Sequence, residues 1–206
     1  MACRIDEVMV NYVEHGSGVP LVALHGAGVD HREIEAAIED VIPADGYRRI
    51  YPDLPGMGHT TTGRLAGNDD VVTLLGDFIE RVVDGPVLLL GHSYGAYLAR
   101  GVAARRRDRV LGLALLCPVG ERSRDVPEPS VVRTDAFRAP TLIVAGRRDS
   151  VAGYICAGDL LEPYPQSTLA VIEDAGHALM HERPELFAAL LVDWLRRSQT
   201  RDLASA

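Results

Sequence analysis

The amino-acid sequence predicts an α/β fold, a mostly parallel sheet covered by helices on both faces. Short apolar runs alternate along the chain with segments of helical periodicity, which is typical of strands joined by helical crossovers. Several apolar runs end in glycine-containing turns, so polar side chains follow directly after strands. With 206 residues the chain has the length of one ordinary domain. We therefore expect a single domain over residues 1–206.

Five apolar runs have the length and composition of buried strands. They are residues 21–24, 87–90, 110–116, 141–145 and 168–172. Three segments repeat apolar residues at helical spacing, and these are residues 70–83, 96–105 and 184–197. Residues 119–139 contain two prolines and show neither periodicity, so a loop is predicted there.

The composition excludes several kinds of chemistry. The formal net charge is −8, so no positive field attracts nucleic acid or an anionic membrane surface. All 21 basic residues are arginine, which excludes a lysine Schiff base, a P-loop lysine and a Ser-Lys dyad. Cys3, Cys117 and Cys156 are odd in number and far apart, so neither a disulfide framework nor a zinc site is expected.

The sequence predicts neither a signal peptide nor a transmembrane segment. Charged residues interrupt the first ten positions, and no apolar run reaches the length of about 18 residues that a spanning helix needs. We expect a cytoplasmic protein that acts on a small molecule without a metal or cofactor and binds neither nucleic acid nor membrane.

A candidate nucleophile lies in the pattern Gly-His-Ser-Tyr-Gly at residues 91–95. An apolar run precedes this pattern and a helical segment follows it, which predicts a strand, a sharp turn and a helix. Such a turn lifts the hydroxyl of Ser93 out of the sheet, and the two glycines leave room for the tight backbone. A serine in an ordinary tight turn is the alternative interpretation.

Candidate partners for Ser93 follow later strands. A serine hydroxyl needs a base to take its proton, and the base needs a group that orients it. His177 and Asp149 both follow predicted strands, and the order Ser, Asp, His is typical of one class of hydrolase. Glu121 is an alternative acid, whereas Asp174 lies too close to His177 in sequence to reach the far ring nitrogen.

The segment His-Gly-Ala-Gly at residues 25–28 follows the first apolar run, at the same predicted edge of the sheet. Its small residues allow a tight turn that aims an amide at the nucleophile. The backbone N–H groups of Ala27 and Tyr94 could therefore form an oxyanion hole. The ring of His25 is expected to brace this loop rather than to react.

Five motifs in order resemble the α/β-hydrolase family over nearly the whole chain. They are HGAG at 25–28, DLPGMG at 53–58, GHSYG at 91–95, AGRRD at 145–149 and AGH at 175–177. The resemblance implies an eight-stranded, mostly parallel sheet, the catalytic triad Ser93, Asp149 and His177, and an oxyanion hole from Ala27 and Tyr94. It also implies that Asp53 belongs to a structural turn.

One departure from the family pattern concerns the cap. Relatives in this family usually insert several dozen helical residues between the sixth and seventh strands, where this chain has only residues 119–139. A cap reduced to a loop predicts a shallow, wet site with modest acyl selectivity. A homodimer, in which a second copy covers the site, is the alternative.

The favoured function is hydrolysis of a carboxylic ester, thioester or lactone through an acyl-enzyme intermediate. The same fold also supports acyltransferases, carbon-carbon hydrolases and perhydrolases, and these stay open. A ligand-binding or interaction module that keeps the triad without turnover is a candidate from a different class.

Overall fold

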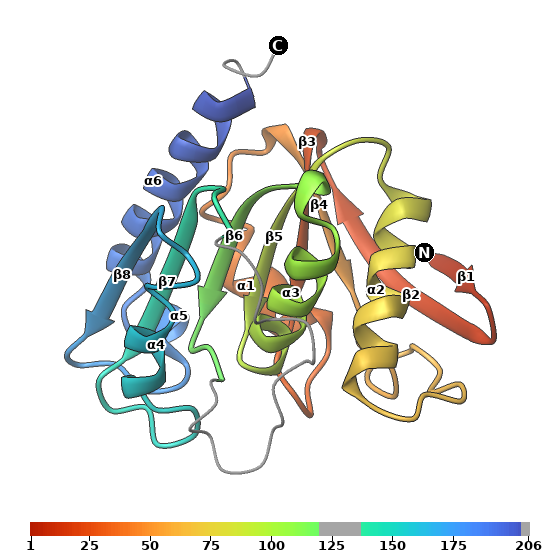
Figure 1. Ribbon diagram of the computed structural model, residues 1–206, viewed down its shortest axis with the longest axis horizontal. Coiled ribbons are helices and arrows are strands. Elements are labelled where there is room, and N and C mark those ends of the chain that lie inside the picture. Colours follow the sequence, from red (N-terminus) through yellow and green to blue (C-terminus); the bar gives the residue numbers. More distant parts are fainter. Residues whose placement is uncertain (120–136, 203–206) are drawn as a thin grey trace.

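Eight strands form one twisted sheet in the computed structural model, which describes residues 1–119 and 137–202 (Figure 1). In chain order the strands are β1 (Ala2–Ile5), β2 (Val8–His15), β3 (Ser17–Leu24), β4 (Asp45–Pro52), β5 (Val87–His92), β6 (Val110–Leu116), β7 (Thr141–Gly146) and β8 (Ser167–Ile172). Their order across the sheet is β1-β2-β4-β3-β5-β6-β7-β8. Strand β2 pairs antiparallel with β1 and β4, and every other neighbouring pair is parallel. The predicted fold class is confirmed.

Helices cover both faces of the sheet. They are α1 (His31–Ile38), α2 (Asn68–Val82), α3 (Tyr94–Arg105), α4 (Ile155–Asp159), α5 (Leu179–Glu182) and α6 (Pro184–Asp202), with a 3₁₀ turn at Arg107–Arg109. Figure 1 shows α2 and α3 in front of the sheet, and α1, α5 and α6 behind it. Within the described residues, no helix is both long enough and apolar enough to cross a membrane.

The two faces of the sheet bury separate apolar cores. Side chains of α2 and α3 pack on one face, and those of α1, α5 and α6 pack on the other. Trp194 on α6 is fully buried, and its ring N–H donates to the carbonyl oxygen of Pro140 at 3.1 Å. This bond fixes α6 against the start of β7.

The predicted helices differ from the observed ones at their ends. Helix α2 begins two residues before the predicted position 70, and Asp69 and Asp70 then lie in its first turn, where the helix dipole favours negative charge. Helix α6 extends beyond the predicted end at residue 197. Of the loop predicted at residues 119–139, residues 120–136 lie outside the described part of the chain.

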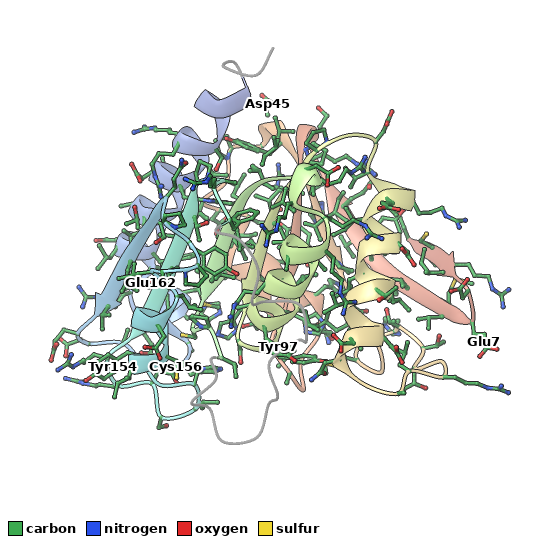
Figure 2. The ribbon with its side chains drawn as sticks, in the orientation of Figure 1. Glu7, Asp45, Tyr97, Tyr154, Cys156 and Glu162 are labelled. Atoms are coloured by element: carbon green, nitrogen blue, oxygen red, sulfur yellow. The ribbon has the colours of Figure 1, made fainter. Side chains whose placement is uncertain are left out.

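Residues that follow the carboxyl ends of the parallel strands lie along one edge of the sheet. Figure 2 labels Tyr97, Tyr154 and Cys156 along this lower edge, whereas Asp45, the first residue of β4, lies at the upper edge. Loops at the carboxyl edge of an open parallel sheet form its usual binding site.

Candidate active site

Ser93 occupies a sharp turn between β5 and α3. Its backbone has φ 53° and ψ −115°, a region that non-glycine residues rarely adopt. The turn is held by the Ser93 N–H, which donates to the carbonyl oxygen of Leu116 at 2.8 Å, and by the Tyr97 N–H, which donates to the Ser93 carbonyl at 3.1 Å. These two hydrogen bonds stabilise the strained backbone of Ser93, and the geometry resembles the strand-to-helix turn known as a nucleophile elbow.

The two glycines of the turn are required by close backbone contacts. A Cβ atom on Gly91 would overlap the carbonyl oxygen of Gly95, and a Cβ on Gly95 would overlap the carbonyl oxygen of Leu24. Backbone atoms on all sides prevent relaxation by a simple side-chain movement. The sequence-based expectation of crowding at these glycines agrees with this geometry.

Gly95→Ala is expected to lower the free energy of unfolding by about 3 kcal/mol or to prevent folding, because overpacking against backbone cannot relax. Gly158 in α4 is a matched control, since no atom lies within 4 Å of a Cβ placed there. Urea denaturation of both variants measures the difference. Equal stability of the two variants would contradict the packing argument.

The structure brings Ser93, His177 and Asp149 together in one hydrogen-bonded chain. The Nε2 atom of His177 lies 3.0 Å from the Ser93 Oγ, and its Nδ1 atom lies 2.9 Å from Oδ2 of Asp149. His177 lies in the loop between β8 and α5, and Asp149 lies in the turn after β7. The imidazole therefore lies between hydroxyl and carboxylate with one nitrogen directed at each.

The carboxylate of Asp149 is held by its own turn. Its Oδ1 atom accepts the N–H groups of Val151 at 2.8 Å and Ala152 at 3.0 Å, which leaves Oδ2 for His177. The side chain is only 1% exposed. Burial opposes ionisation, but the bonds from His177, Val151 and Ala152 outweigh it and lower the pKa of Asp149 to about 2. The group is thus an ionised, fixed acceptor at neutral pH.

The loop with Ala27 lies against the serine turn. A Cβ atom on Gly26 would lie 3.6 Å from the Cβ of Ser93, so the backbone of this loop passes directly beside Ser93. Tyr94 is the first residue of α3, where N–H groups have no acceptor within the helix. An oxyanion hole from the N–H groups of Ala27 and Tyr94 stays a prediction.

His25 and Asp53 brace this region, as the sequence predicts. The ring of His25 donates from Nδ1 to the Gly26 carbonyl at 2.7 Å and accepts the Leu54 N–H at Nε2 at 2.9 Å, which fixes a neutral tautomer. Asp53 accepts the backbone and ring N–H groups of His31 at 2.9 and 2.7 Å. Both side chains are fully buried and structural.

Protonation of His25 is expected to destabilise the fold. Burial lowers the pKa of His25 below its ordinary 6.5, because the buried ring lacks the water that would stabilise its charged form. The unfolded chain then binds more protons, so the stability contributed by neutral His25 is complete above about pH 7 and is lost as the pH falls through 6.5. Urea denaturation between pH 8 and pH 5 measures the slope. His59→Gln, at an exposed histidine, should keep this slope, and a flat wild-type profile would contradict the prediction.

The other candidate acids are not at the site or are not described. Asp174 is 59% exposed and forms an ion pair with Arg148 at 2.5 Å, in agreement with the expected role of a solvated loop acid. Glu121 lies outside the described residues.

Three side chains that the sequence does not mark as site residues lie next to Ser93, His177 and Asp149, and they are the buried His92 and Cys117 and the partly buried Glu33. His92 Nε2 lies 2.9 Å from the backbone carbonyl oxygen of His177, and Cys117 Sγ lies 3.3 Å from the same oxygen. Burial, with the nearby charge of Asp149, raises the pKa of Cys117, so its sulfur is an S–H donor. Glu33 on α1 lies 2.6 Å from His92 Nδ1. Nothing in the sequence pattern marks these pairs, which are formed only by the fold.

The ligand-type atoms of His92, Cys117 and His177 lie within 4.8 Å of one another. His92 and Cys117 both contact the backbone carbonyl oxygen of His177. The ring of His177 contacts Ser93 through Nε2 and Asp149 through Nδ1. A metal bound by His177 would displace the contact of its ring with Ser93 or with Asp149. The cluster therefore supports the position of His177 rather than a metal site.

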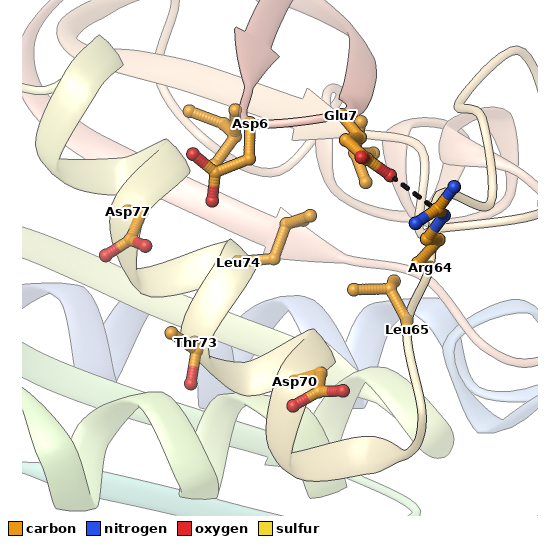
Figure 3. A pocket seen from close by; sticks show the side chains of 10 residues that line it. Asp6, Glu7, Arg64, Leu65, Asp70, Thr73, Leu74 and Asp77 are labelled. Atoms are coloured by element: carbon orange, nitrogen blue, oxygen red, sulfur yellow. Dashed lines mark ion pairs between the residues drawn. The ribbon is translucent and has the colours of Figure 1, made fainter.

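A groove of about 490 Å³ opens elsewhere, between the β1–β2 turn and α2 (Figure 3). Its lining includes four acidic side chains, and one of them, Glu7, pairs with Arg64 at 3.7 Å. None of the triad residues lines it.

Comparison with known sequences supports the architecture. A curated relative, the (E)-2-((N-methylformamido)methylene)succinate hydrolase of Acinetobacter baylyi, is 33% identical over 135 residues, which cover 62% of this chain and 48% of that protein. The 2-hydroxy-6-oxo-6-(2'-aminophenyl)hexa-2,4-dienoic acid hydrolase of Metapseudomonas resinovorans is 33% identical over 117 residues, 55% of this chain and 40% of the relative. The chain thus spans less than half the length of these relatives.

The chain is also similar to solved structures and matches a family model. A crystal structure of an alpha/beta superfamily hydrolase from Oenococcus oeni has a TM-score of 0.82 at 23% identity, covering 94% of this chain and 97% of the other, which shows the shared fold. The family model described as "Alpha/beta hydrolase family" matches residues 21–153, more than half of the chain. The chain therefore belongs to the α/β hydrolase family.

Proposed function

We propose that this protein is a serine hydrolase that cleaves a carboxylic ester, thioester or lactone of a small molecule. Ser93 is the nucleophile, His177 the general base and Asp149 the acid that orients it. The observation that carries the proposal is the continuous chain of contacts from Ser93 Oγ through His177 to Asp149, at 3.0 and 2.9 Å. An imidazole held in this way can take the serine proton during attack.

The first half of the reaction forms an acyl-enzyme. The Oγ atom of Ser93 attacks the substrate carbonyl carbon, and its proton moves to Nε2 of His177. The N–H groups of Ala27 and Tyr94 stabilise the tetrahedral oxyanion, a contribution of about 3 to 4 kcal/mol per donor in comparable sites. Collapse breaks the bond to the leaving alcohol or thiol, which takes the proton from His177.

The second half releases the acid. Water loses a proton to Nε2 of His177 and attacks the acyl carbon, which forms a second oxyanion in the same position. Collapse breaks the bond to Ser93 Oγ, and the proton returns from His177 to the serine. Ionised Asp149 stabilises the imidazolium in both halves and keeps Nδ1 protonated.

A second candidate comes from the names of two relatives, which describe hydrolases of a methylenesuccinate derivative and of a 2-hydroxy-6-oxo-dienoic acid. Hydrolysis of an unsaturated small carboxylic acid would use the same triad. The two candidates differ in substrate class and share the nucleophile.

Turnover of short p-nitrophenyl esters, acyl thioesters, lactones and a 2-hydroxy-6-oxo-dienoate tests both candidates. We expect a burst of p-nitrophenol equal to the enzyme concentration, and an acyl mass on the peptide that contains Ser93. Turnover of the dienoate alone would favour the second candidate. No burst and no turnover with any substrate would instead favour a ligand-binding module.

A further inference from the structure

Strand β8 forms one edge of the sheet, where β7 is its only strand neighbour among the described residues (Figure 1). On the β7 side, the carbonyl oxygen of Ile172 accepts the N–H of Arg147 at 2.8 Å. Backbone groups of successive strand residues point in alternating directions, so Leu169 and Val171 direct their N–H and C=O groups away from β7. Within residues 1–119 and 137–202, these four groups have no hydrogen-bond partner.

This edge is accessible and lacks the usual protection against pairing. All six residues of β7 are buried, whereas in β8 only Ile172 is buried and Val171 is 40% exposed. The opposite edge strand, β1, is four residues long and carries the exposed Arg4, and a short, charged edge resists pairing. Strand β8 has six residues, none of them charged or proline, in continuous register with β7. Such an edge can accept another strand.

A second copy of β8 fits this edge in an antiparallel register with a twofold axis at Ala170. Leu169 then lies opposite Val171 of the second copy, and Val171 lies opposite Leu169 of that copy. Because both residues direct their backbone groups outward, the two pairs form four inter-copy hydrogen bonds. Their side chains share one face of the sheet, so each leucine also contacts a valine across the axis.

Helix α6 extends this surface behind the edge and runs in the opposite direction to β8 (Figure 1). Arg197 of α6 donates from Nη1 to the carbonyl oxygen of Gln166, at the start of β8, at 3.4 Å. Leu186 lies on the same side of α6 about three turns earlier, toward the carboxyl end of β8. The Leu186 residue is 41% exposed, so apolar surface continues from the edge onto the helix.

Charges at the two ends of β8 are complementary in this register. The exposed Glu173 directly follows β8. In the antiparallel pair it lies opposite Ser167 of the second copy, beside the Arg197 of that copy. Bonds within its own chain use three of the five N–H groups of Arg197, so the guanidinium can also donate to this carboxylate. The twofold axis repeats the contact at the other end.

We propose that two copies of this chain associate through β8, so that their sheets join into one continuous sheet across a twofold axis at Ala170. The contact is isologous, with the same surface on both copies, and such a contact closes as a dimer. Ser93 follows β5, three strands away from β8 in the sheet, so the second copy leaves the candidate active site uncovered.

Sedimentation equilibrium of the wild type and of Val171→Lys tests the surface. We expect a wild-type dimer with a Kd in the micromolar range, since a strand edge with a flanking helix is a small interface. Val171→Lys should raise this Kd about tenfold or more, because it removes both Leu169–Val171 contacts and places two ammonium groups across the axis.

Met9→Lys is the matched control for Val171→Lys. Met9 is a similarly exposed apolar residue, but its strand β2 has a neighbour on each side. It should leave the Kd unchanged, and circular dichroism checks that both variants keep the fold. A wild type that is monomeric at about 200 µM, or a Kd that Val171→Lys leaves unchanged, would overturn the proposal.

Ala170→Cys tests the register independently of the lysine variants. In the proposed dimer residue 170 lies opposite its own copy in a pair without hydrogen bonds, with Cα atoms about 4.5 Å apart, a distance that a disulfide can bridge. Oxidised glutathione, which takes up the two electrons and two protons of the thiols, should therefore convert this variant into a covalent dimer.

Thr168→Cys is the control for the register, since it lies on the same face of β8 but opposite Ile172 of the second copy. Its two thiols would be about 14 Å apart along the pair and should not link. The wild type, whose Cys117 and Cys156 are buried and whose Cys3 lies on β1, should stay unlinked as well. Equal cross-linking of Thr168→Cys and Ala170→Cys, or none in Ala170→Cys, would overturn the proposed pairing.

Discussion

Ser93→Ala is expected to lower kcat for ester hydrolysis by about 10⁶-fold, as loss of the nucleophile does in comparable triads. Among the serines of residues 1–119 and 137–202, only Ser93 has both a positive-φ turn and an imidazole nitrogen at 3.0 Å from its Oγ. Removal of Oγ prevents the acyl-enzyme altogether, so residual turnover comes from water and the oxyanion hole. A fluorophosphonate should label the wild-type peptide that contains Ser93 and should not label the variant.

Ser198→Ala is the matched control for Ser93→Ala. Ser198 is also a buried serine, but its hydroxyl donates to the Trp194 carbonyl at 2.9 Å within α6. Its loss should lower stability slightly and leave both turnover and labelling unchanged. Labelling that persists in Ser93→Ala would assign the nucleophile elsewhere and would remove the basis of the proposed mechanism.

The central strands are predictable from sequence because both of their faces are buried. All six residues of β5 and all six of β7 are buried, and such strands appear as continuous apolar runs. Helices α2 and α6 are predictable for a related reason, since each buries one stripe of apolar residues. The ends of helices depend on capping and tertiary contacts, and there the expected bounds differ from the observed ones, as at the start of α2 and the end of α6.

Strand β4 could not be predicted because charged residues interrupt its pattern. Arg49 is only 4% exposed, although buried arginine is rare in a strand. It forms a two-point contact with Glu39, at 2.7 and 3.0 Å, and donates to the carbonyl of Tyr47 at 3.1 Å. Glu39, directly after α1, neutralises the charge of Arg49. The two side chains meet only when the end of α1 packs against β4.

Strand β2 was missed for a different reason. Its buried residues Val8, Val10 and Tyr12 alternate with more exposed ones, as in a strand with one face on the core. Met9 is apolar but exposed, so the alternation does not appear in the sequence. The three triad residues could be placed together because parallel strands end at one edge, whereas the pair of Glu33 and His92 follows no such rule.

Asp149→Asn is expected to lower kcat by about 10⁴-fold without unfolding the protein. The N–H groups of Val151 and Ala152 point at the Oδ1 position, so the amide must place its oxygen there. Its NH₂ group then faces Nδ1 of His177, which can only accept. The ring is left with its hydrogen on Nε2, directed at Ser93, and can no longer take the serine proton. Steady-state kinetics at pH 8 measures the loss.

Asp174→Asn is the control for this substitution, because that exposed acid lies three residues before His177 and pairs with Arg148. It should change kcat by less than about twofold. The pKa of Asp149 is lowered to about 2 from an ordinary 3.8, so its ionised form contributes stability that is complete above about pH 4 and is lost as the pH falls toward 2. Asp149→Asn should therefore have a flatter acid profile of unfolding free energy than wild type. A larger loss of kcat in Asp174→Asn than in Asp149→Asn would mean that another carboxylate orients His177, and the tautomer argument would fail.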